Sequence, residues 1–399
     1  MLTVSVAVHR GLNLDSRLCH TARRCPPAVQ YIAYMNQPDI ADVAIREKLG
    51  AYEDPYLSQT LAEAKAVESV TLQSGAVSVR LVLGFPCADY VAELKTALQN
   101  HLQPLLGQSR LDLTLRAQIT AHAVQRTLKP LGNVKNIVAV ASGKGGVGKS
   151  TTAANLALAW AAQGAKVGLL DADIYGPSQP LMMGLTGAKP LTADGKLTPL
   201  LAHGVEVMSI GFMIDQEQPM VWRGPMVTQA LTQLLGETNW GELDYLVVDM
   251  PPGTGDIQLT LAQRVPVSGA VIVTTPQDIA LLDARKGLKM FEKVEVRVLG
   301  VVENMSVHVC NQCGHVEHVF GSGGGARMAT QYGVQLLGEL PLDIRIREDA
   351  DGGAPTVVSE PGSARAQAYL QMARRTAARL ATLNKDYSRA FPKITVEAT

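Results

Sequence analysis

The chain has 399 residues, of which 47% are hydrophobic and 18% are charged, and its 36 basic residues balance 36 acidic ones. This balance argues against nucleic acid or an anionic membrane as the main partner, and no apolar run is long enough to predict a membrane span. Five scattered cysteines do not follow a disulfide pattern, which favours a reducing compartment, so we expect a cytoplasmic protein. The length predicts two or three domains.

The chain opens with a basic leader. Residues 1–35 contain four arginines but a single acid, Asp15, and Met35 at their end offers a second start for translation. An Arg-rich, acid-poor leader is compatible with a transit peptide. We prefer the simpler interpretation that these residues are disordered or not translated.

Residues 36–117 predict a small α+β domain. The expected elements are a helix at 40–50, strands at 67–72 and 76–83, a helix at 89–102 and a strand at 111–115. Cys87 lies just before the second helix, where it is either packed or a reactive thiol, and the packed alternative is favoured because free cysteine is usually buried. Residues 118–134 follow as a linker, with a helix expected around 118–128 and a break at Pro130.

The phosphate-binding pattern G-x-x-x-x-G-K-[ST] lies at residues 143–150, between an apolar run and a helical run. Glycines let the backbone curl so that successive N–H groups face phosphate, and the following helix adds its positive end. We expect Lys149 to reach the β- and γ-phosphates of ATP and the Ser150 hydroxyl to bind Mg²⁺. The predicted nucleotide-binding residues of this loop are Gly143, Lys144, Gly145, Gly146, Val147, Gly148, Lys149, Ser150 and Thr151.

Residues 135–385 predict an α/β ATPase domain with a mostly parallel, doubly wound sheet and helices on both faces. The expected strands lie at 137–141, 167–170, 246–248, 270–274 and 298–302, and the expected helices at 149–162, 278–293 and 363–383. The alanine-rich face of the last helix favours packing on the sheet over membrane binding. Residues 386–399 form a tail.

Acidic residues follow two of these strands. Asp171 and Asp173 end one strand and Asp249 ends another. Ligands of doubly wound sheets bind at the carboxyl ends of the strands, so these carboxylates are expected near the γ-phosphate. Asp249 is predicted to hold Mg²⁺ through water, and Asp171 to support Mg²⁺ or the loop.

Cys310 and Cys313 form a C-x-x-C pair in a glycine-flanked loop. Two such thiolates can share one metal or cluster, but iron–sulfur clusters and structural zinc generally need four ligands. An intrachain zinc site with His315 and His318 and a redox-active pair are alternatives. A cluster shared with a second copy of the chain is favoured, because the stretch from Cys310 to His318 is short for zinc ligation.

Several motifs carry a family resemblance. The K-G-G-V-G-K-[ST] loop, with its second lysine Lys144, resembles the deviant P-loop ATPases of the MinD/ParA, nitrogenase-reductase and Mrp/ApbC families. The stretches GLLDADIYGPS, WRGPM, DYLVVDMPPGTGD, TTPQDIALLDARKG, FGSGGG and GELPLDIRIREDADGG, with ENMS before the C-x-x-C-G, resemble the Mrp/ApbC iron–sulfur cluster carriers. The match is strong over about residues 134–380. The preceding domain is similar to the iron–sulfur-assembly-associated domain of these proteins.

The resemblance implies a homodimer in which Lys144 reaches the nucleotide of the partner subunit, although a solvated loop lysine is the alternative. It implies that Asp173 positions the attacking water and that Asn304 contacts adenine, with Pro341 nearby. It further implies a labile cluster, of the [4Fe–4S] type, held between two C-x-x-C pairs. ATP binding and hydrolysis would then drive transfer to apo iron–sulfur proteins, with scaffold proteins as further partners.

Two rival functions remain at this stage. A positioning or partitioning ATPase of the MinD/ParA type would act on membrane or DNA and would have no use for a C-x-x-C pair. A metabolic P-loop ligase would need a small carbon substrate for ATP turnover.

Overall fold

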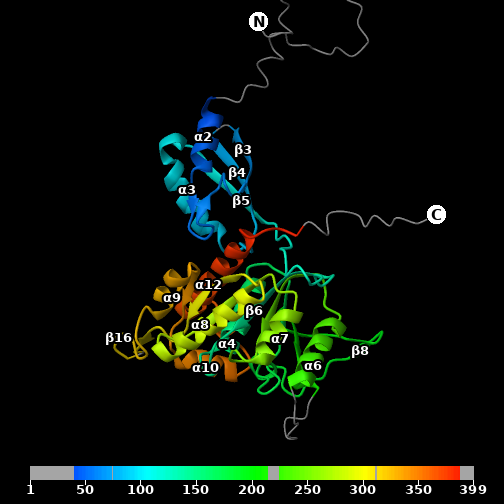
Figure 1. Ribbon diagram of the computed structural model, residues 1–399. Helices are drawn as coiled ribbons and strands as arrows, with labels where there is room; N and C mark the ends of the chain where they lie inside the picture. The colour runs from blue at the N-terminus through cyan, green and yellow to red at the C-terminus, as the bar shows by residue number, and fades with distance from the viewer. Residues whose placement is uncertain (1–39, 74, 214–223, 311, 387–399) are drawn as a thin grey trace, which may run out of the picture.

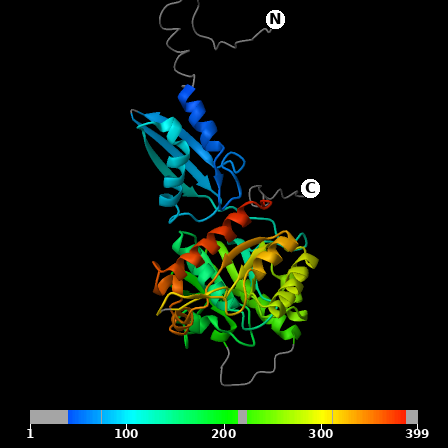
Figure 2. The ribbon, with the colours of Figure 1, turned by 90° about the vertical axis from the view of Figure 1, so that its left-hand side faces the viewer.

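The computed structural model describes residues 40–73, 75–213, 224–310 and 312–386. It contains a small domain and a larger α/β domain, which lie one above the other in Figures 1 and 2. The predicted leader and all but the first residue of the predicted tail lie outside the described residues. Within the described ranges, no helix is both long and apolar enough to cross a membrane.

The small domain packs two helices, α2 (Ile40–Gly50) and α3 (Val91–Leu106), against a three-stranded sheet. Strands β3 (Val67–Gln73) and β4 (Ala76–Leu83) are antiparallel, and β5 (Arg110–Ala117) pairs parallel to β4. A short pair, β1 (Glu53–Asp54) and β2 (Gln59–Thr60), precedes them. Helix α3 buries a leucine at every fourth position, which is the helical spacing that predicted it.

The helix expected around residues 118–128 is wrong, because hydrogen bonds to distant segments hold this stretch in a non-helical conformation. Gln118 donates its N–H to the carbonyl of the last residue of β4 at 2.8 Å. Farther on, the buried Gln125 amide donates to the carbonyls of Ala262 and Val265 at 2.7 and 3.1 Å. Local periodicity does not reveal such distant partners.

The larger domain is built on an eight-stranded sheet in the order β10-β11-β7-β12-β6-β13-β14-β17. All neighbouring strands are parallel except the edge pair β10 and β11. The strands are β6 (Val134–Ala141), β7 (Val167–Asp171), β10 (Leu200–Ala202), β11 (Val205–Ser209), β12 (Leu243–Asp249), β13 (Gly269–Thr274), β14 (Val298–Glu303) and β17 (Gln335–Glu339). The predicted doubly wound α/β fold is therefore confirmed.

Helices cover both faces of this sheet (Figure 1). Helices α4 (Lys149–Ala162) and α12 (Ala364–Ala381) pack together on one face. The other face carries α6 (Gly224–Glu237), α7 (Asp256–Arg264), α8 (Asp278–Lys293) and α9 (Gly324–Tyr332). Shorter elements are α5 (Gln179–Met182), η1 (Ile210–Phe212), α10 (Ile344–Asp351), α11 (Thr356–Ser359) and the hairpins β8 (Thr192–Ala193) with β9 (Lys196–Leu197) and β15 (His308–Val309) with β16 (Val316–Glu317).

Helix α12 is buried against α4 and β17, as its alanine-rich face predicts. It also contacts the small domain. Its Arg374 is only 4% exposed, and the guanidinium lies 4.8 and 4.7 Å from the ring centres of Tyr56 and Tyr90. The same group donates to the Tyr56 hydroxyl at 2.8 Å and pairs with Asp89 at 2.8 Å. A single arginine of the larger domain therefore contacts three side chains of the small domain.

Candidate functional site

The phosphate loop connects the carboxyl end of β6 to the first turn of α4. Gly146 and Gly148 take φ values of +82° and +79°, a conformation that side chains rarely adopt. A Cβ on Gly148 would also lie 2.1 Å from the Asn304 amide nitrogen. Both the backbone conformation and the lack of space therefore require glycine at position 148. The resulting loop lies at a helix N-terminus, which is suited to bind a phosphate group.

Two buried carboxylates lie beside this loop. Asp171 and Asp249 end the neighbouring parallel strands β7 and β12, and they are directly opposite each other in the strand register. Both are fully buried. The Lys149 ammonium donates to Asp249 Oδ1 and lies 3.1 Å from the Ser150 hydroxyl. The structure thus brings together the predicted Lys149, Ser150 and Asp249.

Burial raises the pKa of Asp171, and the neighbouring charge of Asp249 raises it further. Asp173 is less buried, and burial also raises its pKa, partly offset by the positive charge of Lys149. Two buried carboxylates face one lysine, so the group of charges favours an added cation. Their oxygens and the Ser150 hydroxyl are the hard donors that Mg²⁺ prefers, and the residues present therefore fit this ion.

Gln179, at the start of α5, belongs to this site although sequence reasoning missed it. Its side-chain amide donates to Asp249 Oδ2 at 2.9 Å and to the Ser150 carbonyl at 3.0 Å. Its backbone N–H donates to Asp171 Oδ2 at 3.1 Å. The position, six residues after Asp173 in a Pro-Ser-Gln-Pro turn, was the only sequence signal that could have indicated it.

The other predicted nucleotide residues surround the loop. Lys144 is exposed, where a side chain is free to reach another molecule. Asn304 is buried and donates its amide to the Val147 carbonyl at 2.9 Å. Pro341 is half-buried just after β17. The expected contacts of Lys144 with a partner and of Asn304 with adenine stay predictions.

The cysteine pair lies at the end of the β15–β16 hairpin, which projects from the left edge of the larger domain in Figure 1. Cys310 donates its N–H to the His315 carbonyl at 2.9 Å and accepts from the Gly314 N–H at 2.9 Å. Cys313 is exposed, and Cys310 is half-buried. Backbone N–H groups of Cys313 and Gln312 lower the pKa of the Cys310 thiol, which favours the thiolate that binds metal.

The hairpin offers two cysteine ligands per chain. The His318 ring nitrogen Nδ1 lies 2.8 Å from the Ser306 carbonyl, so this nitrogen is engaged with the backbone. In the part of the chain that the structure describes, no three His, Cys, Asp or Glu side chains gather into a metal-binding group.

Cys87 lies apart from both sites. It is 3% exposed, and burial raises the pKa of its thiol to about 11. The prediction that this cysteine is packed is confirmed.

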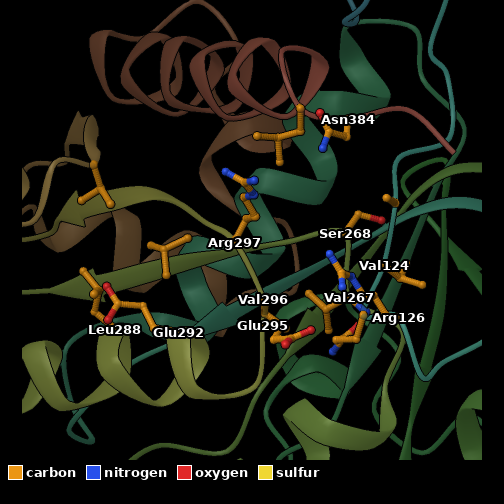
Figure 3. Close-up of a pocket in the computed structure, with 15 residues that line it drawn as sticks. Val124, Arg126, Val267, Ser268, Leu288, Glu292, Glu295, Val296, Arg297 and Asn384 are labelled. Carbon is orange, nitrogen blue, oxygen red and sulfur yellow. The ribbon is translucent and has the colours of Figure 1, made fainter.

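A cavity of about 540 Å³ opens at the opposite edge of the sheet from the phosphate loop. Figure 3 shows that its wall includes linker residues Val124 and Arg126, together with Ser268 just before β13 and Arg297 just before β14. Because these residues lie at the amino ends of the strands, the cavity is separate from the candidate site.

Comparison with known families decides which P-loop class this fold represents. The family model of the NUBPL iron-transfer P-loop NTPases, which belong to the ParA group, matches residues 133–377, more than half of the chain. The chain belongs to this family. The small domain of this NUBPL-family NTPase also matches the family of iron–sulfur cluster assembly proteins, over residues 42–110.

Relatives of this NUBPL-family NTPase are similar along most of their length. An iron–sulfur cluster carrier protein of Pseudomonas fragi is 62% identical over 278 residues, which cover 69% of this chain and 97% of that protein. One of Escherichia coli K12 is 51% identical over 344 residues, covering 86% and 93%. Among solved structures, a nucleotide-binding protein of Archaeoglobus fulgidus in complex with ADP is 40% identical, with a TM-score of 0.52 over 58% of this chain and 90% of that one.

Proposed function

We propose that this chain is an ATP-dependent iron–sulfur cluster carrier, which receives a labile cluster on Cys310 and Cys313 and passes it to apo-proteins. The observation that carries the proposal is the presence, in one domain, of a phosphate loop and an exposed hairpin that supplies only two thiol ligands. Relatives named as cluster carriers support it. A MinD/ParA-type positioning ATPase would leave the cysteine pair without a role.

In the nucleotide half of the site, the protein's own groups bind and orient the triphosphate. The loop N–H groups and the start of α4 bind the phosphates. The Lys149 ammonium leaves Asp249 and binds the β- and γ-phosphates instead. Asp249 and Ser150 would hold Mg²⁺, which neutralises charge on the phosphates when bound. Asp173, whose pKa is raised by burial, is suited to orient and polarise the attacking water.

At the cysteine hairpin, the iron–sulfur cluster obtains its remaining ligands from a second copy of the chain. Two hairpins related by a two-fold axis supply Cys310 and Cys313 twice, which gives the four thiolates that a [4Fe–4S] cluster takes. Lys144, exposed on the loop, would reach the partner's nucleotide in the same dimer. Apo iron–sulfur proteins, and scaffold proteins as donors, are then the partners.

Anaerobic reconstitution with iron and sulfide tests the proposal. We expect a dimer with charge-transfer absorbance at about 400 nm, as for other thiolate-ligated clusters. Cys310→Ala and Cys313→Ala should each lose the cluster, whereas the control Cys87→Ala should keep it because that thiol is packed. A monomer that holds a complete cluster, or absorbance that survives loss of both hairpin cysteines, would refute the shared site.

A further inference from the structure

The buried Gln179 has a role in the nucleotide site that goes beyond packing. We infer that Gln179 is a positioning residue, which is held by the first turn of α4 and orients the carboxylate of Asp249 so that the site binds Mg²⁺ together with nucleotide. The inference deepens the nucleotide half of the proposed function and does not depend on the cluster half. It rests on the hydrogen bonds of Gln179 and on the distribution of charge around it.

The first step concerns the two oxygens of Asp249. Oδ1 accepts from the Lys149 ammonium and Oδ2 accepts from the Gln179 amide. When Lys149 turns to the phosphates, Gln179 stays, because it is held from the other side by the Ser150 carbonyl. The carboxylate then keeps its orientation and Oδ1 becomes available to the metal hydration shell.

The second step concerns the neighbouring carboxylate. The backbone N–H of Gln179 donates to Asp171 Oδ2, which also accepts from the Ser209 hydroxyl at 3.1 Å. One residue therefore contacts both buried acids and the backbone of the loop helix. Asp171 and Asp249 would otherwise repel each other across adjacent strands, so a neutral donor between them stabilises the pair without removing the charge that attracts a cation.

The third step concerns the remaining polar atom of the side chain. Gln179 is fully buried, yet its Oε1 has no hydrogen-bond partner among the described residues, and the same is true of the Ser178 hydroxyl beside it. Buried acceptors are rarely left unpaired in proteins. Oε1 is thus suited to accept from a donor that arrives with the ligand, and water bound to Mg²⁺ is a donor of this kind.

The variant Gln179→Met tests the inference, because methionine has a similar shape but neither donates nor accepts strongly. Binding of a fluorescent ATP analogue is measured by titration with Mg²⁺ and, separately, in EDTA. Since hydrogen bonds to charged groups are the stronger class, we expect the Mg²⁺ concentration for half-saturation to rise about tenfold. Affinity for the nucleotide in EDTA should change little, because the loop N–H groups and Lys149 are intact.

A matched control is Gln125→Met, which removes another buried glutamine that makes three hydrogen bonds to backbone, far from the site. It should lower thermal stability without shifting the Mg²⁺ titration. An unchanged Mg²⁺ titration in Gln179→Met, or an equal loss of affinity with and without Mg²⁺, would overturn the positioning role. Gln179→Ala provides the same readout if the methionine variant does not fold. Cluster loading of the variant, measured in parallel, tests the cluster half independently.

Discussion

Replacement of Arg374 by methionine should loosen the contact between the two domains. The guanidinium is buried between the rings of Tyr56 and Tyr90 and pairs with Asp89 on the small domain, although it belongs to α12 of the larger one. Methionine keeps the unbranched stem but loses the charge and all of its donors. The change therefore acts on domain docking and leaves the core of either domain in place.

The magnitude follows from the individual contacts. Each of the two cation–π contacts contributes about 0.5–2 kcal/mol, and the hydrogen bond to the Tyr56 hydroxyl contributes about 1 kcal/mol. The side chains of Asp89 and Glu93 are 33% and 58% exposed, so water solvates them in the variant and their pairing adds only about 0–1 kcal/mol. We expect a loss of about 2–6 kcal/mol of docking free energy, the range that these contacts span together, which is large for an interface inside one chain.

Urea unfolding followed by two probes measures this effect. Tryptophan fluorescence reports the larger domain through Trp160 and Trp240, whereas far-ultraviolet circular dichroism reports both domains. The two transitions should coincide in the unaltered protein and separate in Arg374→Met, with the small domain unfolding first. Arg375→Met is the control, since the neighbouring Arg375 donates to the Leu337 carbonyl and does not contact the small domain in this way. Coincident transitions in both variants would refute the reasoning.

Three further predictions concern the candidate sites. Lys149→Ala should abolish nucleotide-dependent cluster transfer to an apo-ferredoxin and leave cluster loading intact, because the loop and the hairpin use separate side chains; equal loss of both would contradict this. Asp171→Asn should stabilise the nucleotide-free protein increasingly as pH rises above about 4, the ordinary value for aspartate. Burial and the charge of Asp249 raise the pKa of Asp171 in the folded protein, so the contribution of Asp171 to stability is lost as pH rises through that folded-state value. The melting temperature of Asp171→Asn should therefore exceed that of the unaltered protein by more at pH 8 than at pH 5. Cys87→Ala should lower the free energy of unfolding by about 1–2 kcal/mol through a small cavity, and a fall in iron content per dimer would instead indicate a role in loading.

The sequence predicted the elements whose signals are local. Helix α4 has the expected bounds because the phosphate loop precedes it and Gly164, with φ +96°, follows its last turn. Helix α8 likewise has the bounds that its periodicity predicted. The prediction of a linker helix was wrong because this stretch bonds to residues that are far away in sequence, and local patterns carry no information about them.

The same distance explains which functional residues escaped prediction. Gln179 acquires its role from Asp249, 70 residues later, and Arg374 contacts a tyrosine 318 residues earlier. The sequence around a single glutamine or arginine does not indicate whether its side chain is buried and hydrogen-bonded or exposed to water. Phosphate loops and cysteine pairs differ because their chemistry requires a fixed local spacing, which is readable before the fold is known.

The two candidate sites are joined by one short segment of the chain, which follows strand β14. Strand β14 ends just before Asn304, whose amide holds the Val147 carbonyl and fills the space beside Gly148. Four residues later the cysteine hairpin begins, and its His318 contacts the Ser306 carbonyl within the same segment. Because the loop and Asn304 are in direct contact, the loop cannot shift toward or away from phosphate without moving Asn304 or breaking its hydrogen bond. The backbone from Asn304 to His308 therefore runs directly from a hydrogen-bond partner of the phosphate loop to the first residue of the cysteine hairpin.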